Sequence, residues 1–223
     1  MSPPLFRLEH RRTHRLIASK HDRPALADLF DDDDEAAAVF DLDGATNDRL
    51  IAEAGRIIGI SIDELVSGVP YASIVNAAFT HPHPYGGRFN TSERGAWYAA
   101  FELETALAEV IFHHTAWLRE IDRWHDAVTK DEWCADFTGE FHDLREPGEH
   151  AGALDPDPAT GYPLGQALAA ALIEAGSLGS IYPAVRNPGG TNIACFRPAL
   201  VQNVQRGKTV ALTWNGSDTP IVG

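Results

Sequence analysis

The sequence reads GGRFN at residues 86–90, WYAA at residues 97–100 and LETALAE at residues 103–109. Two glycines precede Arg88, so the backbone beside this arginine can approach a ligand closely. The apolar residues 96–101 predict a short strand, and the run that follows predicts a helix. We therefore expect a glycine turn, a strand and a helix in immediate succession, with charged side chains beside apolar surface.

The helix is predicted over residues 103–118, because apolar residues recur there at spacings of three and four. Glu109 and His113 are four residues apart and share a face beside the apolar stripe. An arginine fork suits a phosphate oxygen, and a buried glutamate suits a developing positive charge. Arg88, Tyr98 and Glu109 together point to a site for a phosphate-bearing substrate with a cation-like transition state.

Each of these three residues also has a purely structural interpretation. Arg88 could be a surface arginine on a turn, and Tyr98 could be a core residue. Glu109 could form an ion pair with a nearby arginine, since a carboxylate on an apolar face usually has a partner or a function. Only their position relative to one another separates these interpretations from a shared site.

The rest of the chain alternates strands and helices irregularly. We expect strands over residues 14–19, 180–186, 191–196 and 209–214, helices over 48–55 and 161–176, and mixed structure over 71–79. A loop containing Pro82 and Pro84 leads into the glycine turn, and residues 187–190 predict a hairpin turn. Without a regular βαβ rhythm, this pattern favours an α+β fold with a mixed sheet flanked by helices. No linker divides the chain, so we expect one domain over 1–223 with its core at roughly 14–214.

Composition restricts the partners that this chain can have. The formal net charge is −14 over 223 residues, which argues against direct nucleic-acid binding, because that needs a basic patch. Much of the excess lies in residues 31–35 and 155–157, which we interpret as solvated loops. No stretch has the length of a signal peptide core or a membrane span, so we expect a cytoplasmic protein that does not enter a membrane.

The cysteines and histidines give no local metal motif. Cys134 and Cys195 do not form a CxxC pair, and Cys195 lies in an apolar run typical of a core strand. The ten histidines include neighbouring pairs, but no spacing resembles HExxH. We therefore expect no metal ion. A dinucleotide fingerprint of the GxGxxG type is also absent.

Taken together, these motifs resemble the RES-domain family, the toxin half of bacterial toxin–antitoxin pairs whose antitoxins carry an Xre-like DNA-binding domain. The resemblance covers nearly the whole chain, and its specificity lies in the joint spacing of the segments. They are residues 15–20, 78–82, 87–90, 97–100, 104–109, 182–190 and 196–198.

The resemblance implies a fold related to ADP-ribosyltransferases and cleavage of the nicotinamide–ribose bond of NAD, by phosphate or by water. It assigns the family arginine to Arg88 and the family glutamate to Glu109, with Tyr98 as a third catalytic residue. It also implies substrate-binding roles for Arg15, Lys20, Asn90 and His113. NAD, with or without inorganic phosphate, would be the substrate, and no metal is implied.

The chemistry of these residues agrees with that assignment. Loss of nicotinamide leaves an oxocarbenium-like ribose, which Glu109 would stabilise. Arg88 and Arg15 would bind the pyrophosphate, and Tyr98 would stack on or hydrogen-bond to the nicotinamide end. The family serine is not matched: residues 162–166 read YPLGQ, and Ala184 stands where a serine is common. Thr105 or Ser180 could substitute for it, but neither stands at the matching place.

Two alternatives remain open at the level of sequence. The chain could be a catalytically weakened RES protein that acts mainly through a protein partner, or a metal-dependent hydrolase with converging histidines. An enzyme that destroys NAD needs a restraint in its own cell, so we expect an Xre-type antitoxin that closes the active cleft. We also expect a homodimer.

Overall fold

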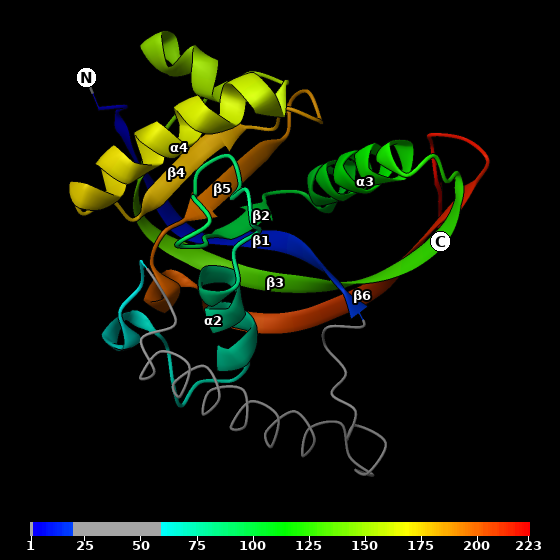
Figure 1. The fold of residues 1–223 in the computed structure, drawn as a ribbon. Helices are drawn as coiled ribbons and strands as arrows, with labels where there is room; N and C mark the ends of the chain where they lie inside the picture. Colours follow the sequence, from blue (N-terminus) through cyan, green and yellow to red (C-terminus); the bar gives the residue numbers. More distant parts are fainter. Residues whose placement is uncertain (1, 20–58) are drawn as a thin grey trace.

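The computed structural model describes residues 2–19 and 59–223 (Figure 1). In chain order the elements are β1 (Leu5–Ala18), η3 (Ile62–Glu64), α2 (Ala72–Thr80), β2 (Trp97–Ala100), α3 (Leu103–Glu120), β3 (His125–Asp143), η4 (Gly148–Leu154), α4 (Pro158–Glu174), β4 (Gly179–Pro183), β5 (Thr191–Cys195), η5 (Pro198–Leu200), β6 (Gln202–Asn215) and β7 (Ile221–Val222). The helix expected over 48–55, the acidic run 31–35 and Lys20 lie outside the described residues.

The strands form one mixed sheet in the order β1-β2-β5-β4-β3-β6-β7, with a further pairing of β1 to β3. Among the described strands, only β3 and β4 pair in parallel, and the other pairs are antiparallel. Because β1 pairs with both β2 and β3, the five strands β1, β2, β5, β4 and β3 close into a barrel-like ring, from which β6 and β7 extend. The mixed sheet and its helices confirm the expected α+β class.

The ring is filled by side chains that alternate along its strands, as the two-residue period of a strand requires. Trp133, Ala135 and Phe137 of β3 meet Trp97 of β2 and Ile193 of β5 in one buried cluster. The intervening residues of β2, β4 and β5 face the other way, where Tyr98, Tyr182 and Ala194 pack with residues of α4. These central strands are thus buried on both faces.

Helices α3 and α4 stand over the same side of the ring, with β2 between them, and α2 lies on the opposite side (Figure 1). The outer half of α3 is fixed by a third cluster, in which Leu118 packs on Val210, Leu212 and Trp214 of β6. The Trp214 indole Nε1 also donates to the hydroxyl of Thr115 on α3, at 3.1 Å. Since Glu109 lies on this helix, the packing of α3 on β6 fixes where its carboxylate can reach.

Several boundaries differ from the expectation, and one strand was missed. Residues 71–79, expected as mixed, belong largely to α2, and β1 begins at Leu5 rather than at residue 14. The strand expected over 180–186 ends at Pro183, and the last long strand begins at Gln202 rather than at residue 209. Strand β3, the longest of the described strands, was not anticipated, because the charged residues on its outer face dilute the apolar signal of its inner face.

The hairpin turn, the short strand at 97–100 and the helices α3 and α4 were predicted correctly within a few residues. In the acidic segment 155–157, Pro156 and Asp157 are exposed as expected of a solvated loop. Asp157 has a structural function as well, because its carboxylate accepts from the Ala159 N–H and caps α4. The start of α4 is therefore set by this acidic segment.

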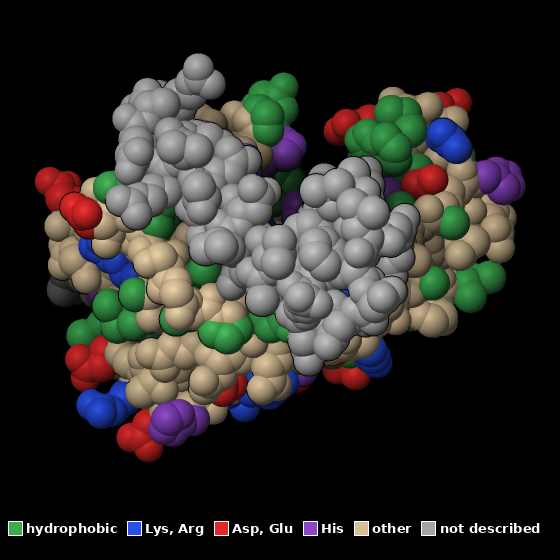
Figure 2. Space-filling model, turned by 90° about the horizontal axis from the view of Figure 1, so that it is seen from below, with side chains coloured by type: hydrophobic (Ala, Val, Ile, Leu, Met, Phe, Trp, Pro, Cys, Tyr) green, Lys and Arg blue, Asp and Glu red, His purple; other side chains and the backbone are tan. Residues whose placement is uncertain are grey.

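Charged and apolar side chains mix on the molecular surface. On the face shown in Figure 2, acidic, basic and hydrophobic side chains of the described residues are interspersed. Among the described residues, none of the helices combines the length and apolarity that a membrane span requires.

Candidate active site

A cavity of about 1100 Å³ opens on the outer face of the ring, between the glycine turn, β1, β2, α3 and α4. This size is slightly above the usual range for small-molecule sites, about 300–1,000 Å³. Among the described residues, its charged lining consists of three arginines and two glutamates: Arg15, Arg88, Arg186, Glu109 and Glu120. The lining is therefore locally cationic in a chain that is acidic overall, which suits an anionic ligand.

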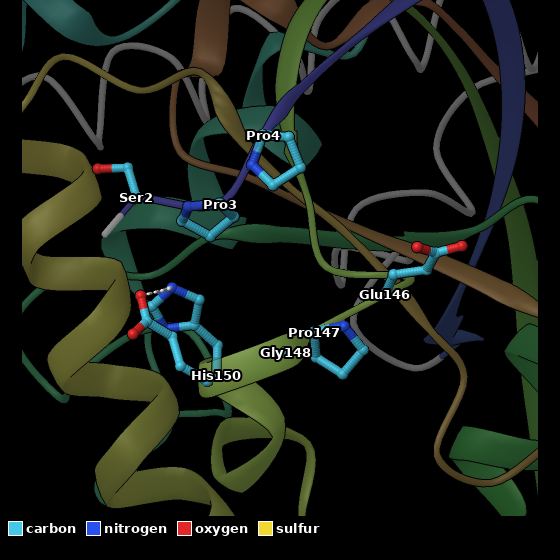
Figure 3. A pocket seen from close by; sticks show the side chains of 8 residues that line it. Ser2, Pro3, Pro4, Glu146, Pro147, Gly148 and His150 are labelled. Carbon is cyan, nitrogen blue, oxygen red and sulfur yellow. Dashed lines mark ion pairs between the residues drawn. The ribbon is translucent and has the colours of Figure 1, made fainter.

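A second cavity, of about 390 Å³, lies between the N-terminal segment and the start of η4 (Figure 3). Prolines form much of its wall, and Glu149 and His150 form an ion pair with each other there, at 3.8 Å. None of the described residues that were predicted for the site contributes to it. The larger cavity is accordingly the candidate site.

Arg88 is anchored with its guanidinium at the wall of the cavity. Its Nη1 donates to the carbonyl oxygens of Ala153 and Asp155, at 2.8 and 3.0 Å, and the residue is 8% exposed. In the described part of the chain all hydrogen bonds of its side chain come from Nη1. This arrangement fixes the guanidinium and leaves the rest of the fork for an anion.

Helix α4 reaches Arg88 only because glycines face it. A Cβ atom at Gly165 would overlap the carbonyl oxygen of Arg88, and one at Gly161 would lie 2.7 Å from Nη1 of Arg88. From the same helix, Gln166 Nε2 donates to the carbonyl oxygens of Tyr85 and Gly87, at 3.1 and 3.0 Å. Close packing and two hydrogen bonds together hold the glycine turn against α4.

The Tyr98 hydroxyl organises the segment that carries Arg88. It accepts from the Phe89 N–H and donates to Oδ1 of Asn90, both at 2.8 Å. Burial is the main cause that raises the pKa of Tyr98, so the hydroxyl stays protonated. Tyr98 lines the cavity as predicted, but its hydroxyl is committed to the turn, which makes it a positioning residue.

Asn90 differs from its predicted role. It is buried and does not line the cavity, and its Nδ2 donates to the carbonyl oxygens of Thr91 and Arg94. Both ends of its amide are thus used inside the turn. The sequence placed it next to Arg88 correctly, but adjacent residues of a tight turn need not face the same side.

Glu109 projects from α3 into the cavity, where its Oε1 accepts from Nδ2 of Asn192 on β5, at 3.1 Å. Desolvation by the cavity wall raises the pKa of Glu109, against the lowering effects of Asn192, Arg186 and Arg88. Arg88 and Glu109 therefore meet in one cavity, as predicted. A poorly solvated carboxylate interacts strongly with any positive charge that develops near it.

Arg15 and His113 also line the cavity, as predicted. Arg15 Nη1 donates to the Tyr98 carbonyl oxygen at 3.0 Å, and its Nε is buried without a hydrogen-bond partner among the described residues. Burial lowers the pKa of Arg15 to about 10, so it remains cationic at neutral pH. Desolvation, followed by the charges of Arg186 and Arg88, lowers the pKa of His113, which favours its neutral form.

The structure adds residues that sequence reasoning did not assign to the site. Arg186 lines the cavity, donates from Nη2 to the Pro156 carbonyl oxygen and stacks 3.4 Å from the ring centre of Phe112. Tyr162 of α4 lies under the guanidinium of Arg88, with 5.3 Å from Cζ to the ring centre. Arg186 lies in residues 182–190, one of the segments that carry the family resemblance. That resemblance was the signal in the sequence that could have identified Arg186 as a site residue.

The two substitutes for the family serine do not reach the cavity. Thr105 is fully buried, and its hydroxyl accepts from Asn187 Nδ2 at 2.9 Å. Ser180 is fully buried on β4. In the part of the chain that the structure describes, the residues that line the cavity include no serine or threonine.

We predict that Tyr98→Phe destabilises the glycine turn, although the aromatic ring at the cavity wall is retained. The substitution leaves the Phe89 N–H and Asn90 Oδ1 unpaired, which costs about 1–3 kcal/mol of unfolding free energy. Urea unfolding measures this loss. Tyr85→Phe is the matched control, because Tyr85 is 83% exposed, and an equal loss in both variants would contradict the positioning role.

We predict that Glu109→Gln stabilises the fold at neutral pH. The folded protein binds the carboxyl proton more tightly than the unfolded chain, because the pKa of Glu109 is raised. Wild-type stability is then lost as the pH rises from the ordinary pKa to the folded one. In urea unfolding, the advantage of the variant should therefore grow as the pH rises above about 4, the ordinary pKa of a glutamate. A difference between the variant and the wild type that does not grow with pH would contradict this prediction.

The comparisons with known proteins bear on the fold that carries this cavity. A chain from the crystal structure of the M. tuberculosis MbcT–MbcA toxin–antitoxin complex matches with a TM-score of 0.43 and 21% identity, over 58% of this chain and 73% of that one. No match was found among curated proteins. The family model of the RES domain matches residues 65–215, from the segment before α2 to the end of β6. The chain therefore belongs to the RES-domain family.

Proposed function

We propose that this chain is a RES-type toxin that cleaves the nicotinamide–ribose bond of NAD and is neutralised by an Xre-type antitoxin. The observation that carries the proposal is the convergence of Arg88, Arg186 and Glu109 on one cavity. Membership of the RES-domain family supports it.

The charges of the cavity suit a dinucleotide. Arg88 and Arg186 are both held by backbone carbonyl oxygens, so little side-chain entropy is lost when they bind an anion. A pyrophosphate carries the oxygens that such planar forks bind best. Arg15 supplies a further positive charge from β1. These cations offset the long-range repulsion that a protein of net charge −14 exerts on an anionic substrate.

Glu109 is the residue proposed to act on the reacting ribose. When the bond from the ribose carbon to nicotinamide breaks, the bonding electrons leave with the nicotinamide nitrogen and the positive charge remains on the ribose. The desolvated carboxylate of Glu109 stabilises that charge more in the transition state than in the ground state. Asn192 keeps the carboxylate in place with its hydrogen bond.

The acceptor is proposed to be water or inorganic phosphate bound in the cavity. Either attacks the oxocarbenium-like ribose directly, so the reaction needs no hydroxyl nucleophile from the protein. Phosphate would give ADP-ribose 1″-phosphate, and water would give ADP-ribose. The neutral His113, one helical turn from Glu109, is available to take a proton from water.

A second candidate function follows from the absence of the family serine at its expected position. Since the described residues that line the cavity include no serine or threonine, the chain could be a weakened member that acts mainly through a protein partner. Binding of NAD without turnover would favour this candidate. The Xre-type antitoxin and a homodimer remain predictions under either function.

We predict that Glu109→Gln lowers the turnover of NAD far more than its binding. The amide keeps the shape and the contact with Asn192 but removes the charge that acts as the ribose becomes cationic. We expect kcat to fall by at least about 100-fold, with the dissociation constant within about threefold. Nicotinamide release and calorimetry measure the two quantities.

Glu104→Gln is the control on the same helix and should leave both quantities unchanged. Equal losses of turnover and binding in Glu109→Gln would show that Glu109 is a binding or structural residue, contrary to the proposal.

We predict that expression of the wild-type chain alone in bacteria depletes NAD and stops growth. Arg88→Ala should relieve the toxicity, because it removes the anchored cation proposed to hold the pyrophosphate. Arg7→Ala, a change on the exposed start of β1, should remain toxic. Free growth with normal NAD and soluble, folded wild-type protein would favour the weakened member over the toxin.

A further inference from the structure

Three side chains that the proposed reaction does not use gather on the outer face of β1 and β3. They are His14, Glu132 and Cys134, and their ligand-type atoms all lie within 4.8 Å of one another. His14 pairs with Cys134 in the β1–β3 register, and Glu132 stands two residues before Cys134 on the same face. The cluster is thus built by strand pairing between residues about 120 positions apart.

The distances within the cluster are close to those of a tetrahedral metal site. Oε1 of Glu132 lies 3.6 Å from Sγ of Cys134, and that sulfur lies 3.8 Å from Nδ1 of His14. Ligands of a tetrahedral zinc ion are about 3.6 Å apart for sulfur–nitrogen and sulfur–oxygen pairs, from the usual bond lengths. Two edges of the tetrahedron are therefore already present.

The third edge is shorter, because a proton now bridges it. Nδ1 of His14 and Oε1 of Glu132 are 2.6 Å apart, the distance of a strong hydrogen bond. A zinc ion would separate these two atoms to about 3.4 Å. A movement of less than about 1 Å in one side chain completes the geometry, and the His14 side chain, with 24% exposure, has the room to make it.

The donor set has the chemistry that zinc prefers, one imidazole nitrogen, one thiolate and one carboxylate. The thiolate and the carboxylate together balance the two charges of the ion. Glu132 and Cys134 are both buried, so their interaction with the ion is only weakly screened. The carboxylate is also held from behind, since its Oε2 accepts from the Lys208 N–H at 3.2 Å.

We propose that His14, Glu132 and Cys134 form a binding site for a divalent transition-metal ion of the zinc class. The fourth ligand is water, supplied from the large cavity, which His14 lines. On binding, the Cys134 thiol releases its proton to solvent, and the proton of His14 moves from Nδ1 to Nε2 so that Nδ1 can bind the ion. No oxidation or reduction is involved.

This site is separate from the proposed cleavage of NAD, which uses Arg88, Arg186 and Glu109. His14 also lines the large cavity, so the two proposed sites are neighbours. Metal binding can be measured without NAD, so either proposal can fail while the other holds.

Cobalt(II) replaces zinc as the spectroscopic probe. Titration of the purified, metal-free full chain with Co²⁺ should saturate at one ion per chain. The complex should show an intense thiolate-to-cobalt charge-transfer band in the near ultraviolet and the strong visible bands of a tetrahedral site. Added Zn²⁺ should displace the cobalt and abolish both features, and Zn²⁺ should raise the melting temperature of the apo chain.

Two cysteine variants make a matched pair. Cys134→Ser should abolish the charge-transfer band, weaken zinc binding by at least about 100-fold and remove the rise in melting temperature. Cys195→Ser should retain all three, because Cys195 is buried inside the ring and its thiol donates to the Arg197 carbonyl oxygen. Circular dichroism tests whether both variants are folded. If Cys134→Ser does not fold, His14→Asn tests a second ligand of the proposed site instead.

The proposal is overturned if no stoichiometric metal binding occurs, which would show that the three side chains only hydrogen-bond to one another. It is equally overturned if the charge-transfer band is absent, or persists in Cys134→Ser while disappearing in Cys195→Ser.

Discussion

The structure depends on the burial of both faces of the short strands β2 and β5. Trp97 and Ile193 point into the ring, while Tyr98 and Asn192, their neighbours in sequence, point out toward α3 and α4. Because side chains alternate strictly along a strand, the packing of the ring core fixes the position of the outer residues. Shifting either strand by one residue would place its core side chains at the cavity wall and its cavity-lining side chains in the core.

The cavity has a cost in stability that its proposed chemistry explains. Glu109 is held where its charged form is poorly solvated, and the buried Arg88 and the half-buried Arg15 donate to backbone carbonyl oxygens rather than to carboxylates. Such groups stabilise a fold less than apolar residues would, and they are typical of sites where charge changes during a reaction. The compact clusters around α3 and α4 offset this cost.

The parts predicted well from sequence are those in which local pattern decides the structure. The periodicity of α3 placed Glu109 and His113 on one face, and the glycines before Arg88 indicated a close backbone approach. Long-range contacts were not readable in this way. Arg186 reaches the cavity from another segment, and the inward turn of Asn90 depends on Tyr98.

The same limit explains the metal ligands. His14 and Cys134 are brought together only by the register of β1 with β3, a strand that the sequence did not reveal. A search for local spacing motifs cannot detect such a cluster. The expectation that the chain binds no metal ion rested on local spacing alone. The proposed site departs from that expectation, because its ligands are brought together by strand pairing.

The central claim is that this cavity breaks the nicotinamide–ribose bond, and a product-resolved assay tests it most directly. The purified wild-type chain is incubated with NAD, with and without inorganic phosphate, and followed by proton and phosphorus magnetic resonance. We predict stoichiometric release of nicotinamide, with ADP-ribose 1″-phosphate as co-product if phosphate is the acceptor and ADP-ribose if water is. NAD that stays intact with folded wild-type protein, under both conditions, would contradict the account.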